Sequence, residues 1–320
     1  MTAPNPSGAL FDRRVTLFLV QGDKALDLSE LQFTFETYQE DEQSPNSCSI
    51  RVFNLSDATL KKIQTEYSRV VLQAGYVNAA FGTIFDGGII QYRIGRNEGS
   101  PDTYLDILAA DGDLAYNFAT INQTLKAGSS ASERLAAVAN SMASKGVSVG
   151  QIIIPSSGGI LPRGKVLFGM AKTMMRSQVQ SVNCTWSIDN GQINVIPLDG
   201  YLPGDAVVLT SATGLIGRVE QTQDGMRARL LLNPLVTIGG LVKIDNASIN
   251  VTISNPSVAL PAGQLIYNQR VGIALPADVA TDGLYRVYVA EYKGNTRGQE
   301  WYTDIVALAV NPVTQKVKAY

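Results

Sequence analysis

Two stretches of this sequence, one near each end, resemble each other closely enough to constrain the fold of the whole chain. Residues Tyr104–Ala109 read YLDILA, and Tyr302–Ala307 read YTDIVA. Other matches come before these and occur in the same order in both copies. SIRVFNL matches ARLLLNP, which aligns Asn54 with Asn233, and VVLQAGY matches GLVKIDN. A glycine-led strand from Gly87 then matches one from Gly283. A shared order of matches indicates an internal duplication, with extra residues in the second copy at 247–282.

Both copies consist mainly of strand-forming residues. Residues 31–38 read LQFTFETY, which alternates side chains as a half-buried strand does, and a short helix is expected after the N-cap residue Ser56. Further strands are predicted at 15–20, 49–56, 70–76, 84–95, 103–113, 206–217, 218–233, 239–246, 249–254, 284–294 and 300–310. We therefore predict an α+β, mostly β fold with two related antiparallel barrel-like domains, because closing a barrel removes exposed sheet edges.

Between the two copies the pattern becomes helical. Ser130 and Glu133 form a capping box, and Gly146 is a typical helix stop. The apolar stripe between them consists of Leu135, Val138, Ala139 and Met142. A second helix is predicted within KVLFGMAKTMMRS, with a stripe of Leu167, Met170, Ala171 and Met174. Such methionines are typical of core packing.

A β-hairpin is predicted to follow these helices. Asn190 and Gly191 separate two short alternating runs, and this dipeptide favours a type I′ turn because both residues tolerate positive φ. The predicted division of the chain is a first barrel-like domain at 1–118, a small α+β domain of two helices and a hairpin at 119–199, and a second barrel-like domain at 200–320.

The cysteine content and the hydropathy indicate a protein that folds in the cytoplasm. Cys48 and Cys184 are the only cysteines, and both lie in strand-like sequence, so we expect two buried, reduced thiols. No apolar run approaches the ~18 residues that span a bilayer. The N-terminal residues have no signal-peptide pattern and are expected to form a flexible lead-in before the first strand.

Most catalytic chemistry is disfavoured by the composition. The chain has no histidine, which excludes Ser-His-Asp and Cys-His arrangements. Ser130 near Lys126 is better explained as a helix cap beside a loop charge. The acidic neighbours Asp41 and Glu42, and Asp111 and Asp113, could form a glycosidase pair or a calcium loop, but they are expected to be solvated. We predict no catalytic, cofactor-binding or metal-binding residues.

Three long strings resemble the baseplate hub proteins of contractile-tailed bacteriophages. They are SATGLIGRVEQTQDGMRARLLLNPLVTIGGLVKIDN, LPRGKVLFGMAKTMMRSQVQSVNCTWSIDNGQINVIP and GLYRVYVAEYKGNTRGQEWYTD, and the resemblance extends from Val15 to Val310. It implies a trimer whose two barrel-like tube domains form a pseudo-six-fold ring continuing the tail tube, with a smaller domain that helps to seat the spike. Some hub proteins carry a lysozyme-like or extended C-terminal domain, which is not expected in this chain.

The resemblance and the duplication lead to one functional prediction. Three copies of a duplicated chain present six similar domains around one axis, which suits an adapter between a six-fold tail tube and a three-fold spike. The expected partners are two further copies of the chain, the tail tube or tube-initiator ring protein, the central spike protein, the baseplate wedge proteins and the tape-measure protein, with DNA only in transit. The expected location is the tail baseplate of the virion, after assembly in the cytoplasm of the host bacterium.

Two further expectations concern particular residues and the channel. Tyr104 and Asp106 are expected to have the same structural role as Tyr302 and Asp304, in the core or in hydrogen bonds between the barrels. The channel lining is expected to be polar or acidic, because Lys and Arg would hold phosphates; the net charge of −2 agrees with this. The alternatives are a tail-associated peptidoglycan hydrolase and a carbohydrate-binding adhesin.

Overall fold

The structure is a computed structural model of the chain, and its strands and helices pack around two hydrophobic cores. It describes residues 10, 12–41, 43–96, 99, 101–155, 159–222, 225–245, 250–251, 279–280, 283–310 and 312–313. The larger core combines strands from both ends of the chain, and the smaller one lies between Ala115 and Val195. The mostly β, α+β composition is as predicted, whereas the domain boundaries remain a prediction.

The first copy of the repeat consists of seven strands and one helix. They are β1 (Arg13–Gln21), β2 (Lys24–Asp27), β3 (Phe33–Glu40), β4 (Ser47–Phe53), α1 (Asp57–Glu66), β5 (Arg69–Tyr76), β6 (Phe81–Arg96) and β7 (Thr103–Ala110). The predicted alternation in β3 is confirmed, since Phe33, Phe35 and Thr37 are buried. Ser56 caps α1, as predicted, by accepting a hydrogen bond from the amide of Thr59.

The second copy follows the middle segment. Its elements are β13 (Val207–Leu209), the 3₁₀ helix η1 (Ser211–Thr213), β14 (Leu215–Gln221), β15 (Met226–Leu231), β16 (Leu241–Ile244), β17 (Asn250–Val251), β18 (Val279–Ala280), β19 (Leu284–Asn295), β20 (Trp301–Ala309) and β21 (Pro312–Val313). Most of the predicted insertion at 247–282 lies outside the described residues.

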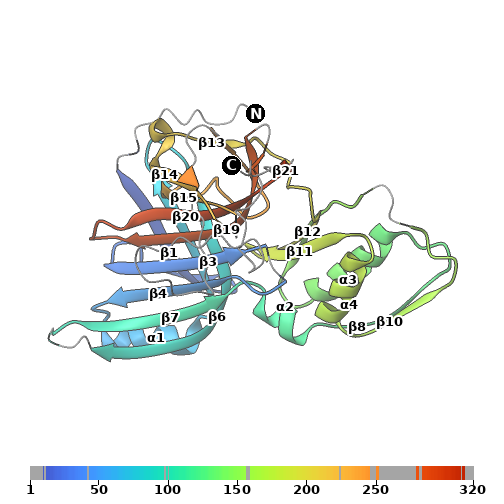
Figure 1. Cartoon of the computed structure of the whole chain (residues 1–320). Helices are drawn as coiled ribbons and strands as arrows, with labels where there is room; N and C mark the ends of the chain where they lie inside the picture. Colours follow the sequence, from blue (N-terminus) through green and yellow to red (C-terminus); the bar gives the residue numbers. More distant parts are fainter. Residues whose placement is uncertain are drawn as a thin grey trace, which may run out of the picture.

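The two copies share one continuous sheet. Its strand order is β17-β14-β15-β20-β19-β3-β4-β7-β6-β5-β1-β2, with β16 also paired to β19 and β13 to β16. The join is the antiparallel pair β19–β3, which runs from Val289 opposite Glu40 to Asn295 opposite Thr34. In Figure 1 the blue strands of the first copy and the red strands of the second therefore lie side by side.

The strand order confirms that the two copies are repeats of one unit. The first copy runs β3-β4-β7-β6-β5 and the second β14-β15-β20-β19-β16. A β-bulge interrupts β6 between Ile89 and Gln91, opposite β7, and an equivalent bulge interrupts β19 between Val287 and Val289, opposite β20. Bulges bend and twist a strand locally, so both copies curve at the same place.

The predicted alignment of the repeats was wrong by one residue in one strand. Arg51 lies opposite Asp106, and Arg229 lies opposite the equivalent Asp304. This register makes Arg51 equivalent to Arg229, so Asn233 lies one position farther along its strand than Asn54 does. The position of an asparagine at the end of a strand depends on the loop that follows it. The pairing of residues across two strands depends instead on the register of the sheet.

The middle segment, residues 113–197, contains three helices and five strands. They are α2 (Asp113–Phe118), β8 (Thr120–Leu125), α3 (Ala131–Ala143), β9 (Ser148–Ile152), β10 (Lys165–Met170), α4 (Ala171–Gln180), β11 (Cys184–Asp189) and β12 (Gln192–Pro197). The capping box between Ser130 and Glu133 is confirmed. Asn190 and Gly191 have φ of 50° and 75°, as the predicted hairpin requires.

The second predicted helix begins later than expected, and α2 was not predicted. Residues Lys165–Met170 form β10, which pairs along its length with β8. Leu167 is buried between the exposed side chains of Val166 and Phe168, a period of two that belongs to a strand. The helix α4 starts only at Ala171, and Met175 rather than Met174 is its buried methionine.

Candidate functional site: the open face of the joined sheet

One face of the joined sheet is left uncovered by the described residues, and we call it the open face. It carries the outward side chains of the eight strands from β14 to β6, which include Ile216, Glu220, Arg227, Arg229, Tyr302, Asp304, Glu291, Lys293, Glu36, Tyr38, Glu40, Ser49, Arg51, Tyr104, Asp106 and Arg93. The opposite face holds the larger core, to which α1 contributes Ile63. Because side chains alternate along each strand, most charged side chains lie on one face of the sheet and the side chains of the core lie on the other.

The same ion pair occurs at equivalent positions of the open face. Arg51 donates from Nε and Nη2 to the two carboxylate oxygens of Asp106, at 2.6 and 2.9 Å. Arg229 donates to Asp304 at the same distances. Hydrogen bonds to these aspartates raise the pKa of each arginine. Bidentate pairs of this kind fix the planes of both groups.

Each of these arginines also lies over a tyrosine ring. The guanidinium carbon of Arg51 is 4.2 Å from the ring centre of Tyr104, and that of Arg229 is 5.3 Å from that of Tyr302. The predicted equivalence of the two Tyr and Asp pairs is thus confirmed. Their expected place in the core or between the repeats was wrong, because each set lies on the open face within its own copy.

A second ion-pair group bridges the two copies. The Nζ of Lys293 on β19 lies 2.8 Å from Glu36 on β3 and 2.9 Å from Glu291 on its own strand. Hydrogen bonds to these two carboxylates raise the pKa of Lys293. Because Glu36 belongs to the first copy and Lys293 to the second, this group marks the join on the open face.

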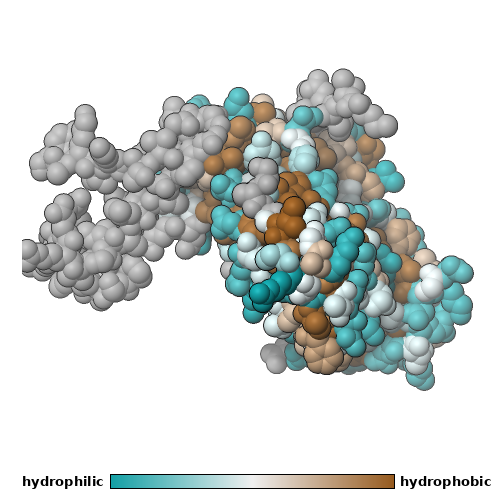
Figure 2. Space-filling model, turned by 90° about the vertical axis from the view of Figure 1, so that its right-hand side faces the viewer, coloured by the Kyte–Doolittle hydropathy of each residue, from teal (hydrophilic) through white to brown (hydrophobic). Residues whose placement is uncertain are grey.

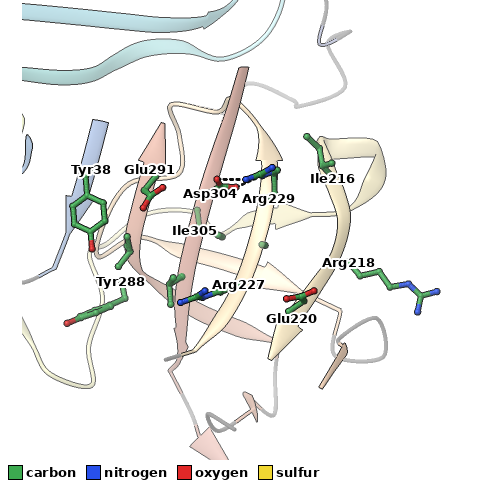
Figure 3. Close-up of a pocket in the computed structure, with 13 residues that line it drawn as sticks. Tyr38, Ile216, Arg218, Glu220, Arg227, Arg229, Tyr288, Glu291, Asp304 and Ile305 are labelled. Carbon is green, nitrogen blue, oxygen red and sulfur yellow. Dashed lines mark hydrogen bonds and ion pairs between the residues drawn. The ribbon is translucent and has the colours of Figure 1, made fainter. Parts of the chain in front are cut away.

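The open face is hollowed where the second copy meets the first. A cavity of about 660 Å³ is lined by Tyr38, Ile216, Arg218, Glu220, Arg227, Ala228, Arg229, Tyr288, Val289, Glu291, Asp304, Ile305 and Val306. Figure 3 shows Tyr38 and Glu291 on adjacent strands and the Arg229–Asp304 pair in the middle, while Arg218 points away. The lining combines three acids and three arginines with five aliphatic side chains and two tyrosines.

Behind the open face, a buried ion pair ties all three parts of the chain together. Arg286 on β19 lies 2.9 Å from Asp41, with the two side chains only 7% and 1% exposed. Arg286 also donates to the carbonyls of Pro197, Leu198 and Gly200, which leave the middle segment. Burial raises the pKa of Asp41 to about 6, although Arg286 opposes this. The expectation that Asp41 is solvated was wrong; Glu42 lies outside the described residues.

Asp111 is a further buried acid, at the contact between β7 and the middle segment. Its carboxylate accepts hydrogen bonds from the amide of Gly191, and burial with the nearby charge of Asp189 raises its pKa to about 8. Asn46 supports the contact by donating to the carbonyl of Ile188. Asp111, which was expected to be a solvated loop acid, is therefore a structural group. Asp113 lies at the start of α2, where a negative charge interacts favourably with the helix dipole.

The other chemical candidates have structural roles in the described residues. The Ser130 hydroxyl accepts from the amide of Glu133 as a helix cap, as predicted. Cys48 and Cys184 are both buried free thiols, and burial raises their pKa values. Within the described residues, no group of three or more Cys, Asp or Glu side chains is arranged to hold a metal ion.

The middle segment has an exposed apolar surface of its own. Phe168 and Val166 on β10 are 70% and 62% exposed, and Leu114 and Phe118 on α2 are similarly exposed. Figure 2 shows this side of the molecule as hydrophobic patches between hydrophilic ones. None of the helices in the described part of the chain is long and apolar enough to cross a membrane.

Comparison with solved structures identifies the fold. A 43 kDa tail protein of prophage MuSo2 from Shewanella oneidensis superposes with a TM-score of 0.54 at 9% identity, over 92% of this chain and 98% of that one. A tail protein from Neisseria meningitidis MC58 gives 0.55 at 8% identity, over 93% and 96%. The chain has the fold of phage tail proteins. Neither a scan of protein families nor a search of curated proteins finds a match.

The sequence analysis did not predict the two arginines that pair with Asp106 and Asp304 on the open face. Arg51 precedes Asp106 in the first copy, as Arg229 precedes Asp304 in the second, and each lies in the strand that pairs with the strand of the matched tyrosine and aspartate. Aligning the copies on these arginines instead of on asparagine would have found both pairs. The Arg286–Asp41 pair has no such signal, because it joins different parts of the chain.

Proposed function

We propose that this chain is the structural hub of a contractile phage tail. As a homotrimer it joins the six-fold tail tube to the three-fold central spike in the baseplate of the virion, without enzymatic activity. The observation that carries the proposal is the repeated unit within a tail-protein fold: two equivalent five-strand units in one chain allow three chains to present six. Assembly takes place in the cytoplasm of the host.

The join between the two copies supplies a template for the contact between chains. Within the chain, β19 of the second copy pairs with β3 of the first. The equivalent of β19 is β6, and the equivalent of β3 is β14. We propose that β6 of one chain pairs with β14 of the next, which closes the sheets of three chains into one barrel-like ring. Closure in this way leaves none of these edges exposed.

The charges at the two edges favour this pairing. Arg93 is exposed on β6 and Glu220 is exposed on β14. By the register of the repeats, Arg93 takes the place of Glu291, and Glu220 takes the place of Glu36, so the two would be diagonal neighbours across the new join. In the single chain β17 pairs with Glu220 and Gln221. Ring closure therefore requires β17 to leave this edge.

The open face is proposed to line the channel through which DNA passes. It is hollowed along the second copy up to the join, and its other side carries the core and α1, so a closed ring has the open face inside. Its charged groups are of both signs and include the carboxylates of Glu36, Glu40 and Glu220 as well as the paired aspartates. This composition supports a lining that is polar rather than continuously basic.

The apolar surface of the middle segment supports a contact with another tail protein. The exposed side chains of Val166, Phe168, Leu114 and Phe118 are of the kind that assembly covers. The spike and the surrounding wedge proteins are the proposed partners. A hydrolase is less well supported, because Asp41 and Asp111 are both buried and engaged in contacts between parts of the chain.

The test is the mass of the purified chain in solution, measured by light scattering over a range of concentrations. We expect a trimer for the wild type. Arg93→Glu and Glu220→Arg should each weaken the trimer, and the two changes combined should restore it. Lys62→Glu on the exposed side of α1 is the matched control and should have no effect. A wild-type monomer at all concentrations, or a double variant weaker than either single one, would contradict the ring.

A further inference from the structure

In two arginines of the open face, Arg51 and Arg229, one hydrogen-bonding edge and one face of the guanidinium plane are occupied. Arg51 uses Nε and Nη2 on Asp106 and stacks on Tyr104, and Arg229 does the same with Asp304 and Tyr302. The fork of Nε and Nη2 is the edge with which arginine grips a phosphate bidentately. A guanidinium held in this way keeps its charge but loses its best geometry for binding a polyanion.

Stability does not explain why the pair is present in both copies. The arginine side chains remain 40% and 53% exposed, and exposed ion pairs contribute only about 0–1 kcal/mol. The repeats differ at many neighbouring positions, for example at Ser49 and Arg227, which are equivalent in register. The Arg-Asp-Tyr arrangement nevertheless occurs in each copy. A role that depends on the open face itself accounts for this better.

We infer that Asp106 and Asp304 shield the arginines of the open face, so that double-stranded DNA passes over it without being held. This inference rests on the proposed function, which brings DNA past this surface. Free arginines would contact DNA phosphates and release the counterions bound there. Each such contact adds to the binding affinity and makes that affinity fall more steeply as the salt concentration rises. The shielding aspartates supply the competing carboxylate within the protein, at a fixed distance and on a rigid sheet.

Lys293 extends the same arrangement to the join between the copies. Its ammonium is held between Glu36 and Glu291, at 2.8 and 2.9 Å. Three of the cations on the open face are thus paired with carboxylates from adjacent strands or from their own strand. In the proposed ring, Arg93 would gain Glu220 of a neighbouring chain as its partner. Paired cations are therefore present in both copies and at the join between them.

The inference is tested by binding of the purified chain to a short, fluorescent, linear DNA duplex, followed by anisotropy between about 50 and 200 mM NaCl. The wild type should bind weakly. The variant Asp106→Asn/Asp304→Asn should bind at least about tenfold more tightly at low salt, and its slope of log affinity against log salt should steepen by up to about two. Adding Arg51→Gln and Arg229→Gln should abolish the gain.

The matched control is Glu30→Gln/Glu40→Gln, which changes the net charge equally without releasing an arginine. A gain in the control equal to that of the aspartate variant would show that net charge alone acts, and would overturn the inference. Tight, strongly salt-dependent binding by the wild type would overturn it too, and this measurement needs no variant to fold. Failure to form a trimer would contradict the hub proposal alone, because DNA binding to the open face can be measured on a single chain.

Discussion

The carboxylate of Asp111 accepts hydrogen bonds from the backbone amide of Gly191 at 2.9 and 3.2 Å, and so holds the end of β7 against the hairpin of the middle segment. Asp111 is buried at this contact, and its neighbour Asp189 is half-buried. Because burial disfavours the charged carboxylate, the contact between the sheet and the middle segment depends on pH.

Stability should fall as pH rises through the neutral range. Burial raises the pKa of Asp189 to about 6 and that of Asp111 to about 8, whereas both acids titrate near 4 when unfolded. The folded chain binds more protons between pH 4 and 8, so the free energy of unfolding decreases with pH there, by up to about 1.4 kcal/mol per unit for one proton. Urea unfolding at pH 5, 7 and 9 measures this.

Asp111→Asn should remove most of the slope between pH 6 and 8, because an amide stays neutral and its oxygen can still accept from Gly191. Asp23→Asn, in the exposed turn between β1 and β2, is the control and should keep the wild-type slope. An unchanged slope in the Asp111 variant would mean that another group is responsible.

Arg286 should be among the side chains that matter most for stability. Arg286→Met leaves Asp41 buried without its charge partner and removes the donor to three carbonyls, which should cost about 3–5 kcal/mol. Adding Asp41→Asn should recover part of the loss, because the uncompensated charge is then gone. Lys62→Met on α1 serves as control, and equal stability of the Arg286 and Lys62 variants in denaturant unfolding would refute this prediction.

The open-face pairs should matter little for stability. A double-mutant cycle with Arg229→Gln and Asp304→Asn should give a coupling free energy below about 1 kcal/mol, because both groups are partly exposed to water. The cycle of Arg51→Gln and Asp106→Asn should agree with it. Coupling above about 2 kcal/mol in either copy would make these pairs structural elements and remove the need for a role toward DNA.

Two glycines with positive φ should differ sharply in their tolerance of alanine. At Gly75, with φ of 152°, a Cβ would lie 2.1 Å from the carbonyl oxygen of Ala80, so Gly75→Ala should cost more than about 3 kcal/mol. At Gly22, with φ of 56°, a Cβ meets nothing within 4 Å, and Gly22→Ala should cost only the strain of about 1–2 kcal/mol. Thermal unfolding of both variants separates the two effects, and similar losses would contradict the prediction.

The elements that the sequence predicted correctly are those defined by nearby residues. The alternation of β3, the cap of α3 and the turn at Asn190 depend on neighbours within a few positions. The strand at Lys165–Met170 was mistaken for a helix because its apolar residues fit both periods, and pairing with the distant β8 decides between them.

What the sequence could not reveal depends on contacts between distant segments. The pairing of β19 with β3 has no local signal, since either strand could have joined another edge. The burial of Asp41 and Asp111 follows from the same long-range packing, and adjacent acids otherwise suggest a solvated loop. The duplication itself was visible, but its register became certain only when the cross-strand partners of Asp106 and Asp304 were known.

The shared sheet makes the two halves of the chain dependent on each other. The strand β19 pairs on one side with β20 and on the other with both β16 and β3. Cutting the polypeptide between the copies would therefore leave two fragments whose unpaired strand edges are complementary. Such fragments, produced separately, would be expected to reassociate with each other or to capture the wrong partner. Carrying both units in one polypeptide thus fixes which neighbour each unit meets first.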